Sequence, residues 1–331
     1  MSRAKGDIPC GRDSILIVVA GVSQSDLKHA AELLRAGRLV AFPTETVYGL
    51  GANALSAEAV ARIFEAKGRP RTSPLIVHVA TPDEVSSVVS HWPEVAQRLT
   101  AKFWPGPLTL VLPKTEAVPD IVTAGLPTVG IRMPRHDIAL ALLRECGLPL
   151  AAPSANRFTQ VSPTTAEHVR RSLGDRVDFI LDGGPCTVGI ESTVLSLATP
   201  QPTILRPGGI SRTEIESLIG SVAVSTEAAS GAHASPGMHA KHYSPHTRLL
   251  LSKDGEVPHA GHGIYLRLFH DAQHPCEAMY MPTDPREYAA ALYGTLHDLD
   301  ARSLDWIAVE LPPVNHAWEA VLDRLRRAAH P

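Results

Sequence analysis

The alternation of strand-length apolar runs with amphipathic helical stretches is the feature that most constrains how this chain can fold. The run RLVAFP at 38–43, for example, is followed by a stretch at 56–68 with apolar residues at helical spacing. Ser56 and Gly68 stand where such a helix would begin and end, because serine caps helix starts and glycine tolerates the left-handed conformation after a last turn. This alternation predicts an α/β or mixed α+β fold with a large sheet.

The same pattern extends from the N-terminal region to residue 220. Candidate strands are short apolar runs bounded by glycine, proline or polar residues, and they lie at 15–21, 38–43, 75–80, 108–113, 128–134, 148–153, 178–183, 193–198 and 203–208. Candidate helices lie at 25–37, 56–68, 83–102, 137–145, 164–173 and 211–219.

The alternation lapses over residues 221–246 and then resumes. The lapse begins SVAVSTEAASGAHASPG, which is typical of a linker, and ends in MHAKHYSP, which is richer in functional side chains than a passive tether requires. Strand-like and helix-like stretches fill 247–331, and a chain of 331 residues suits two domains of roughly 100–200 residues each. We therefore expect a first domain over 1–220, a linker over 221–246 and a small α/β domain over 247–331.

Charge, cysteine content and apolar run length exclude several classes of protein. The net charge is −3, whereas a protein that binds nucleic acid through its overall field should be strongly basic. The 4 cysteines form no CxxC pair, which argues against a zinc site or disulfide framework and fits a reducing cytosol. No run reaches the roughly 20 apolar residues of a membrane span. We expect a cytoplasmic protein without a membrane anchor.

Arginines stand at the ends of predicted strands, beside glycine and hydroxyl side chains. Arg132 ends the run TVGIR and Arg206 ends the run TILR, while GIESTV places Ser192 and Thr193 at the edge of another strand. A buried arginine must be paired, so each one alone is more often part of a structural ion pair. Their recurrence in one pattern favours a single shared pocket for anions.

A cluster of basic residues in KGRPRTSPL, residues 67–75, is a second candidate anion site. Lys67 and Arg69 would project to the same side of an extended segment. A guanidinium fork and an ammonium point charge on a rigid turn suit a polyphosphate. The alternative is a solvated basic turn whose charges favour the end of the preceding helix.

Short hydrogen-bonding side chains follow the predicted strand at 148–153. Ser154 and Asn156 stand at its exit, and Ser162 and Thr164 come before the next helix. Ligands of open α/β sheets bind beyond the carboxyl ends of strands. Capping of the helix would explain Ser162 or Thr164, but not the pair at the strand exit.

Two glycine-rich motifs do not support a nucleotide loop of a standard type. GLGANA at 49–54 lacks the acidic residue that should follow about 20 positions later in a dinucleotide fold, and GLPTVGIR at 125–132 lacks the Lys-Ser/Thr of a P-loop. The residues alone therefore predict an enzyme that binds a phosphate-rich ligand and a carboxylate and that acts by positioning and electrostatic stabilisation.

Taken together, the ordered motifs resemble a known family. FPTETVYGLG, KGRP with SPLIVHV, FWPGPLTLVL, VGIRMPRH, APSAN with SPT, GIESTV, LRPGG and HYSP occur in this order. They resemble the YrdC-like family, specifically its two-domain threonylcarbamoyl-AMP synthases, over nearly the whole chain. The resemblance implies a twisted open sheet with helices and a concave pocket, followed by a small Rossmann-like C-terminal domain.

The resemblance also implies a reaction. The family joins L-threonine, bicarbonate or CO2, and ATP into threonylcarbamoyl-AMP and releases pyrophosphate. A partner complex then transfers the threonylcarbamoyl group to the adenosine beside the anticodon of tRNA. Mg²⁺ is implied as the cofactor, held through ATP and not by a metal site of the protein.

Roles for individual residues follow from the same resemblance. Lys67 and Arg69 are implied as the catalytic pair. The residues implied for ATP are Arg69, Ser73, Thr128, Ala152, Ser154, Asn156, Ser162, Arg206 and Tyr243. The residues implied for L-threonine are Thr46, His78, Arg132, Ser192 and Thr193.

The motif HYSP bears on whether residues 221–246 form only a linker. In two-domain members of the family, the segment that carries this motif folds back over the nucleotide. Tyr243 is the implied ATP contact, so we expect the second half of 221–246 to act as a lid. The alternative is a disordered tether. The sequence departs from the family's common residues at two positions, and each departure concerns a single contact. Ser73 stands where asparagine is common, and Thr159 stands where glycine is common.

Two other functions stay open at this point. Related YrdC-like domains make carbamoyl-adenylate from carbamoyl phosphate, but usually in chains with additional domains that are not visible here. Weak binding of tRNA or double-stranded RNA is the other alternative, and the mildly acidic chain does not favour it as the sole role.

Overall fold

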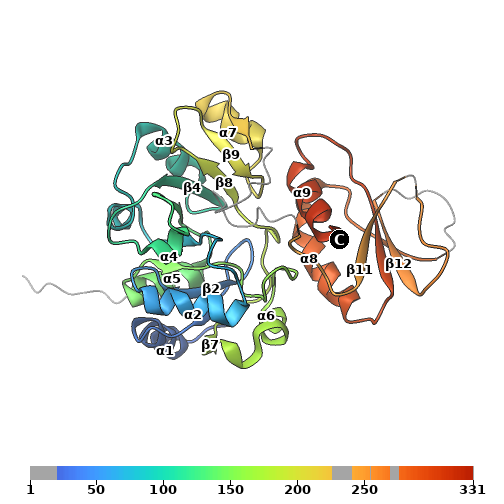
Figure 1. Ribbon diagram of the computed structural model, residues 1–331, viewed down its shortest axis with the longest axis horizontal. Helices are drawn as coiled ribbons and strands as arrows, with labels where there is room; N and C mark the ends of the chain where they lie inside the picture. Colours follow the sequence, from blue (N-terminus) through green and yellow to red (C-terminus); the bar gives the residue numbers. More distant parts are fainter. Residues whose placement is uncertain (1–20, 226–240, 254, 269–275, 331) are drawn as a thin grey trace, which may run out of the picture.

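The computed structural model describes residues 21–225, 241–253, 255–268 and 276–330. The first predicted strand, at 15–21, therefore lies outside the described residues except for its last glycine. Two sheets with flanking helices organise the described chain, which confirms the α/β fold expected from the alternation. Figure 1 shows the larger unit and the smaller one side by side.

The helices match most of the predicted ones. They are α1 Gln24–Arg35, α2 Ala57–Lys67, α3 Glu94–Phe103, α4 Asp120–Thr123, α5 Asp137–Cys146, α6 Ala166–Leu173, α7 Arg212–Ile219, α8 Pro285–Asp300 and α9 Glu319–Ala328, with short 3-10 helices η1 Pro82–Ser87 and η2 Gly174–Arg176. Ser56 does cap α2 by accepting from the amide of Ala59, and Gly68 follows it in the left-handed conformation at φ 63°.

The strands of the larger sheet come in the order β10-β9-β8-β4-β5-β3-β6-β2-β1-β7. Their bounds are β1 Val40–Phe42, β2 Gly49–Asn53, β3 Ile76–His78, β4 Leu108–Pro113, β5 Thr128–Arg132, β6 Leu150–Ala151, β7 Phe179–Ile180, β8 Thr193–Ser196, β9 Thr203–Arg206 and β10 Ala223–Val224. The sheet is mixed, since β3 and β5 run parallel while β4 pairs antiparallel with β5.

Three local predictions need correction. The helix expected over 83–102 is η1 followed by α3, because Pro93 takes an extended conformation and forms the N-cap of α3. The linker expected from residue 221 begins later, because β10 adds to the edge of the large sheet in parallel with β9. The cap of α6 is Thr165, which leaves the hydroxyl of Ser162 for another partner.

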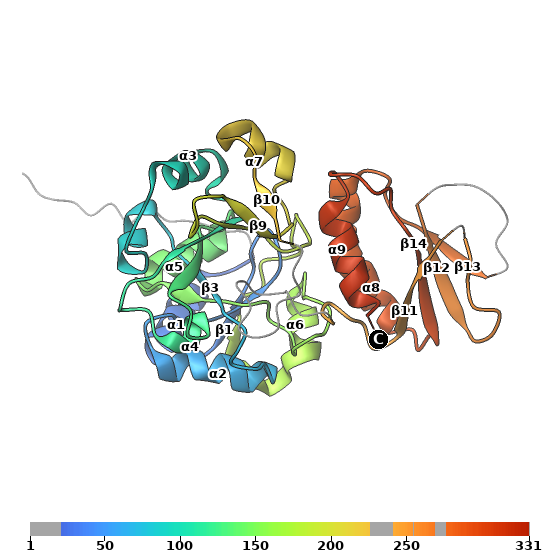
Figure 2. The same ribbon diagram turned by 45° about the horizontal axis from the view of Figure 1, so that its top comes forward.

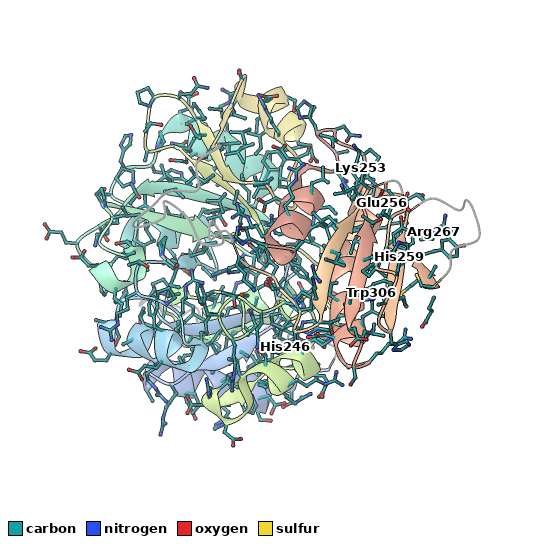
Figure 3. All side chains as sticks on the ribbon, turned by 45° about the vertical axis from the view of Figure 1, so that its right-hand side comes forward. His246, Lys253, Glu256, His259, Arg267 and Trp306 are labelled. Carbon is teal, nitrogen blue, oxygen red and sulfur yellow. The ribbon has the colours of Figure 1, made fainter. Side chains whose placement is uncertain are left out.

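The smaller unit has a four-stranded parallel sheet in the order β11-β14-β12-β13. Its strands are β11 Arg248–Ser252, β12 Gly263–Arg267, β13 Glu277–Tyr280 and β14 Trp306–Glu310. Helices α8 and α9 lie between this sheet and the larger unit in both Figure 1 and Figure 2. Trp306 packs with Tyr265 and Ala308 in a separate apolar cluster on the other face of the sheet, and Figure 3 labels it in the smaller unit.

The cores explain how the two units are joined. Two apolar clusters lie against the large sheet, and a third fills the space between the small sheet and α8 and α9. This third cluster, which we call the junction cluster, also contains residues of the larger unit and the segment after the linker: Val47, Val161, Ile190 and Tyr243. Burial of apolar side chains from both units in one cluster stabilises their contact.

In the part of the chain that the structure describes, no helix combines the length and the apolar character that crossing a bilayer demands.

Candidate functional site

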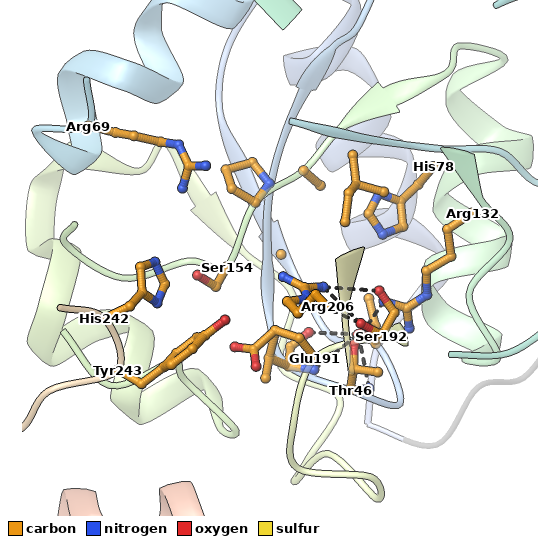
Figure 4. Close-up of a pocket in the computed structure, with 16 residues that line it drawn as sticks. Thr46, Arg69, His78, Arg132, Ser154, Glu191, Ser192, Arg206, His242 and Tyr243 are labelled. Atoms are coloured by element: carbon orange, nitrogen blue, oxygen red, sulfur yellow. Dashed lines mark hydrogen bonds between the residues drawn. The ribbon is translucent and has the colours of Figure 1, made fainter. Parts of the chain in front are cut away.

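A cavity opens at the middle of the large sheet and is closed on one side by the segment after the linker (Figure 4). Its empty volume is about 540 Å³. The lining comes from segments that are far apart in the sequence: Thr44, Thr46, Val47, Gly49, Arg69, Ile76, His78, Arg132, Ala152, Pro153, Ser154, Glu191, Ser192, Arg206, His242 and Tyr243. Concave sites with a few convergent polar groups are the usual place for small-molecule ligands.

Arg132 anchors one end of the cavity from the last position of β5. Its Nη2 lies 2.7 Å from Oε2 of the buried Glu45, and its Nη1 donates to Oγ1 of Thr46 at 2.9 Å. Its Nε donates to the carbonyl of Gly106 at 3.2 Å. Thr44 continues the network through a 2.8 Å contact between its hydroxyl and that of Thr46. This end of the cavity is therefore a fixed guanidinium with hydroxyl groups beside it.

His78 lies next to this end, at the last position of β3. Burial, reinforced by the positive charge of Arg132, lowers the pKa of His78 to about 3, so the imidazole is neutral. Its ring meets Phe42 edge-on at 6.3 Å between centroids, and its Nδ1 has no hydrogen-bond partner among the described residues. A neutral imidazole with an open ring nitrogen can accept or donate one hydrogen bond to a ligand.

Arg206 provides a second guanidinium from the last position of β9. Its Nε and Nη2 donate to the carbonyl of Ser192 at 3.3 and 3.0 Å. The hydroxyl of Ser192 lies 2.8 Å from that of Thr109, which holds it toward the cavity. Thr193, in contrast, donates its hydroxyl to the carbonyl of Ile210 at 2.6 Å and does not line the cavity.

Arg69 contributes the third guanidinium, just after α2. Its Nη2 donates to the carbonyl of Pro74 at 3.1 Å, while its Nε finds no acceptor among the described residues. Burial lowers the pKa of Arg69 to about 10, which still leaves it charged at neutral pH. A buried cation with an open donor is suited to an anionic ligand.

Lys67 is placed differently from Arg69, although the sequence groups them. Its ammonium donates to the carbonyls of Ser154 and Asn156, and it does not line the cavity. Burial, followed by the charge of Arg69, lowers the pKa of Lys67 well below its ordinary value. In this structure, Lys67 therefore holds the strand exit that carries Ser154, and its role as a phosphate contact stays a prediction.

Tyr243 closes the cavity opposite the strands. Its side chain is only 1% exposed, and its backbone takes a left-handed conformation at φ 61°, which is uncommon for a residue with a large side chain. The segment is held on the larger unit, where the amide of Ser244 donates to the carbonyl of Thr159 at 2.8 Å. The phenol oxygen of Tyr243 has no hydrogen-bond partner among the described residues, so it can still bind a ligand.

The structure brings most of the predicted site residues together. Those that line the cavity are Thr46, Arg69, His78, Arg132, Ala152, Ser154, Ser192, Arg206 and Tyr243. Those that do not line it are Lys67, Ser73, Thr128, Asn156, Ser162 and Thr193. Thr128 begins β5 whereas Arg132 ends it, so the two are separated by about 13 Å at the rise of an extended strand.

Sequence reasoning missed three polar residues at this site. Glu45 and Glu191 are carboxylates in a region that was expected to be cationic, and His242 precedes the predicted Tyr243. The signal for the carboxylates was available, because each buried arginine needs a nearby partner and both acids lie within the motifs that were singled out.

Comparison with family models covers both units of the chain. The Sua5/YciO/YrdC model, described as "Telomere recombination", matches residues 32–208. A second model, described as "Threonylcarbamoyl-AMP synthase, C-terminal domain", matches residues 210–330.

Similar proteins also match along almost the whole chain. The threonylcarbamoyl-AMP synthase of Bacillus subtilis is 43% identical, with 92% of each chain covered. That of Pyrococcus abyssi is 41% identical over 95% of this chain and 97% of its own length. The crystal structure of P. abyssi Sua5 complexed with L-threonine has a TM-score of 0.85 and 39% identity, covering 93% of this chain and 95% of that one.

Proposed function

The chain belongs to the threonylcarbamoyl-AMP synthase family, and we propose that its cavity joins L-threonine, bicarbonate or CO2, and ATP into threonylcarbamoyl-AMP with release of pyrophosphate. The observation that carries this assignment is the convergence of three buried guanidinium groups, from Arg69, Arg132 and Arg206, in one cavity. Three cations suit a pair of anionic substrates, one with a carboxylate and one with a chain of phosphates.

The two ends of the cavity suit different substrates. The end built by Arg132, Thr46 and Ser192 offers a guanidinium and two hydroxyls, which fit the carboxylate and hydroxyl of L-threonine. The end built by Arg69 and Tyr243 offers donors that find no acceptor in the described part of the chain, and such donors fit phosphate oxygens of ATP. The P. abyssi structure with L-threonine supports threonine as a substrate of this fold.

The proposed chemistry requires positioning more than proton transfer. The amine of threonine captures CO2 to give a carbamate, a carbamate oxygen attacks the α-phosphorus of ATP, and pyrophosphate leaves. Because the attacking group is already an anion, no strong protein base is needed. Arg132, Arg206 and Arg69 would bring the two anions together and stabilise the charge that develops on the leaving group.

Mg²⁺ is proposed to enter with ATP. Within the residues that the structure describes, no group of three or more His, Cys, Asp or Glu side chains could hold a metal ion. The cavity instead offers cations, which suit a metal carried on the phosphates better than one held by protein ligands. When bound in this way, Mg²⁺ supplies charge neutralisation on the phosphate oxygens.

The segment His242–Pro245 is proposed as the lid of the site. Its buried Tyr243 and His242 cover the cavity from the side of the linker, and the amide of His242 donates to the carbonyl of Arg327 at 3.3 Å. Closure would exclude water from the mixed anhydride, which hydrolyses readily.

Further partners belong to the same proposal. We propose that the adenylate is consumed by a complex that transfers the threonylcarbamoyl group to tRNA, and that the enzyme acts in the cytoplasm. Two of the described cysteines, Cys146 and Cys186, are buried thiols. Weak binding of tRNA or double-stranded RNA stays a secondary proposal.

The first test is pyrophosphate release from ATP and bicarbonate, with and without L-threonine, together with mass spectrometry of the product. We expect release that depends on threonine and a mass equal to threonylcarbamoyl-AMP. Arg69→Met should abolish most of this activity, whereas Arg71→Met, an exposed residue of the same basic turn, is the matched control and should leave it unchanged.

Two results would contradict the proposal. Release that depends on carbamoyl phosphate instead of threonine and bicarbonate would move the enzyme to the carbamoyl-adenylate class. Absence of turnover with either substrate, combined with salt-dependent binding of RNA, would make the chain a nucleic-acid-binding module.

A further inference from the structure

Glu191 places a carboxylate on the wall of a cavity that otherwise offers cations. It lines the cavity and is buried (Figure 4). Its Oε1 accepts from the hydroxyl of Ser162 at 2.7 Å. Its Oε2 accepts from the phenol of Tyr293 at 2.9 Å and from Nε of Arg324 at 2.8 Å. Two of its three side-chain partners therefore come from α8 and α9 of the C-terminal domain.

The charge of Glu191 needs these partners. Burial alone would raise the pKa of its carboxyl, but the guanidinium groups of Arg324 and Arg206 and the hydroxyl of Ser162 outweigh burial and lower it. The side chain is therefore an anion within a site proposed for ATP, where an uncompensated carboxylate would repel phosphates.

Arg324 connects this carboxylate to the lid. It is 0% exposed, and its Nη1 donates to the carbonyl of Pro207, directly after Arg206, at 2.9 Å. Its guanidinium lies over the ring of Tyr243, 5.1 Å from the centroid. Tyr243 in turn stacks on Tyr293 at 5.7 Å between centroids. One buried arginine of the C-terminal domain thus contacts the strand end, the carboxylate and the lid.

The loop that carries Glu191 has little room to rearrange while the domains are docked. A Cβ on Gly189 would lie 2.5 Å from Cα of Ala290 in α8, and a Cβ on Gly208 would lie 2.4 Å from the carbonyl oxygen of Glu191. The absence of side chains at these two glycines is what allows α8 and the loops to approach so closely.

We propose that Arg324 and Tyr293 are positioning residues for the nucleotide end of the site: they neutralise and orient Glu191, so that docking of the C-terminal domain lowers the repulsion between this carboxylate and the phosphates of ATP. This inference rests on the proposed function, and it gives the C-terminal domain a role in substrate affinity besides support of the lid. Without the two partners, the carboxylate of Glu191 would repel the phosphates of ATP.

The test is a double-mutant cycle on ATP affinity, with Kd measured by titration calorimetry in the absence of threonine. Arg324→Met should raise the Kd for ATP by about tenfold or more, because it leaves the carboxylate of Glu191 without its cation. Glu191→Gln added to Arg324→Met should bring the Kd back to within about threefold of the starting protein, because the repelling charge is then gone. The Kd for L-threonine should change by less than about twofold in each variant.

Arg286→Met is the matched control. Arg286 also reaches from α8 to the larger unit, where its Nη2 lies 3.0 Å from Oε1 of Glu214, but its side chain is 81% exposed. Its removal should change the Kd for ATP by less than about twofold, as expected for an exposed ion pair. If Arg324→Met lowers the melting temperature so far that the fold is lost, Arg324→Lys replaces it and should raise the Kd by about threefold, since it keeps the charge without the fork.

Three results would overturn the inference: equal effects of Arg324→Met and Arg286→Met on ATP affinity, a double variant that binds ATP as weakly as Arg324→Met, or a starting protein that binds no ATP. The proposed function fails separately, when ATP binds but no threonine-dependent pyrophosphate release follows. In that case the cycle still reports whether the C-terminal domain sets nucleotide affinity.

Discussion

The two ends of the cavity are built in different ways. At the end proposed for threonine, Arg132 and Thr46 come from one sheet and its connections, and the guanidinium is held by an ion pair with Glu45 and by hydrogen bonds to Thr46 and Gly106. Among the described residues, Nδ1 of His78 is the ring atom left open there. At the end proposed for ATP, Arg69 and Tyr243 keep polar atoms without partners among the described residues, and two side chains from the C-terminal domain donate to the lining residue Glu191.

We therefore call the end proposed for threonine the preformed end and the end proposed for ATP the assembled end. The first depends on the folding of a single domain, because its strands fix the side chains. The second also depends on docking of the C-terminal domain and closure of the lid, and its open donors, which have no acceptor among the described residues, can bind a ligand. Substitutions at the two ends should therefore differ in whether they change stability or ligand affinity.

Arg132→Met should have the largest effect on stability. Loss of one partner of a buried ion pair leaves Glu45 as an uncompensated charge, and such losses cost about 3–5 kcal/mol in the free energy of unfolding. Urea denaturation of the variant measures this, with the exposed Arg135→Met as control. A loss no greater than that of the control would contradict the idea of a preformed end.

Tyr243→Phe, at the assembled end, should weaken ATP binding without lowering stability. The phenol oxygen has no partner among the residues that the structure describes, so its removal should leave the free energy of unfolding unchanged. Its proposed hydrogen bond to a charged phosphate is worth about 1.5–3 kcal/mol, which corresponds to an increase of about tenfold to a hundredfold in the Kd for ATP. Calorimetry with ATP and with threonine measures both affinities. Unchanged ATP binding would remove Tyr243 from the nucleotide end.

Lys67→Met tests whether Lys67 has a structural role or binds a phosphate of ATP. If its ammonium only holds the carbonyls of Ser154 and Asn156, removal should cost about 1–3 kcal/mol of stability, because buried acceptors are left without a donor. Hydrogen exchange should then become faster at residues 152–160. A large rise in the Kd for ATP without a loss of stability would instead make Lys67 a phosphate ligand, as the resemblance implies.

The smallest expected effect is on the pH dependence of stability, and it comes from protonation of His78. The folded protein holds the pKa of His78 at about 3, whereas the unfolded chain binds the proton with the ordinary value of 6.5. Below pH 6.5 the unfolded state therefore binds more protons, and stability falls as the pH decreases, by up to about 1.4 kcal/mol per pH unit for this group. Urea denaturation at pH 6.5 and 5.5 measures the slope. His78→Gln should flatten it and the exposed His91→Gln should not.

The preformed end could be predicted from the sequence to a large extent. Arg132 ends a strand two positions after Gly130, and strand ends of this kind meet at the same edge of an open sheet. What could not be predicted is the choice of partner. Glu45 was missed because a carboxylate was not expected in a pocket for anions, although the buried guanidinium of Arg132 requires one.

The assembled end was less accessible to sequence reasoning. Tyr243 was identified only through resemblance to a family, and nothing in the residues alone links it to Glu191. Arg324 is separated from Glu191 by 133 positions, so no local pattern could pair them. A signal did exist, because Arg324 stands three residues after Val321, on the apolar face of α9, where a charged side chain must find a buried partner.

The junction cluster has a practical consequence for work with fragments of this protein. Val47, Val161 and Ile190 share an apolar core with α8 and α9, so expression of the larger unit alone would expose these side chains to water. Contiguous apolar surface of this kind promotes aggregation. Low solubility of such a fragment would follow from the bare junction surface even where its sheet had folded correctly.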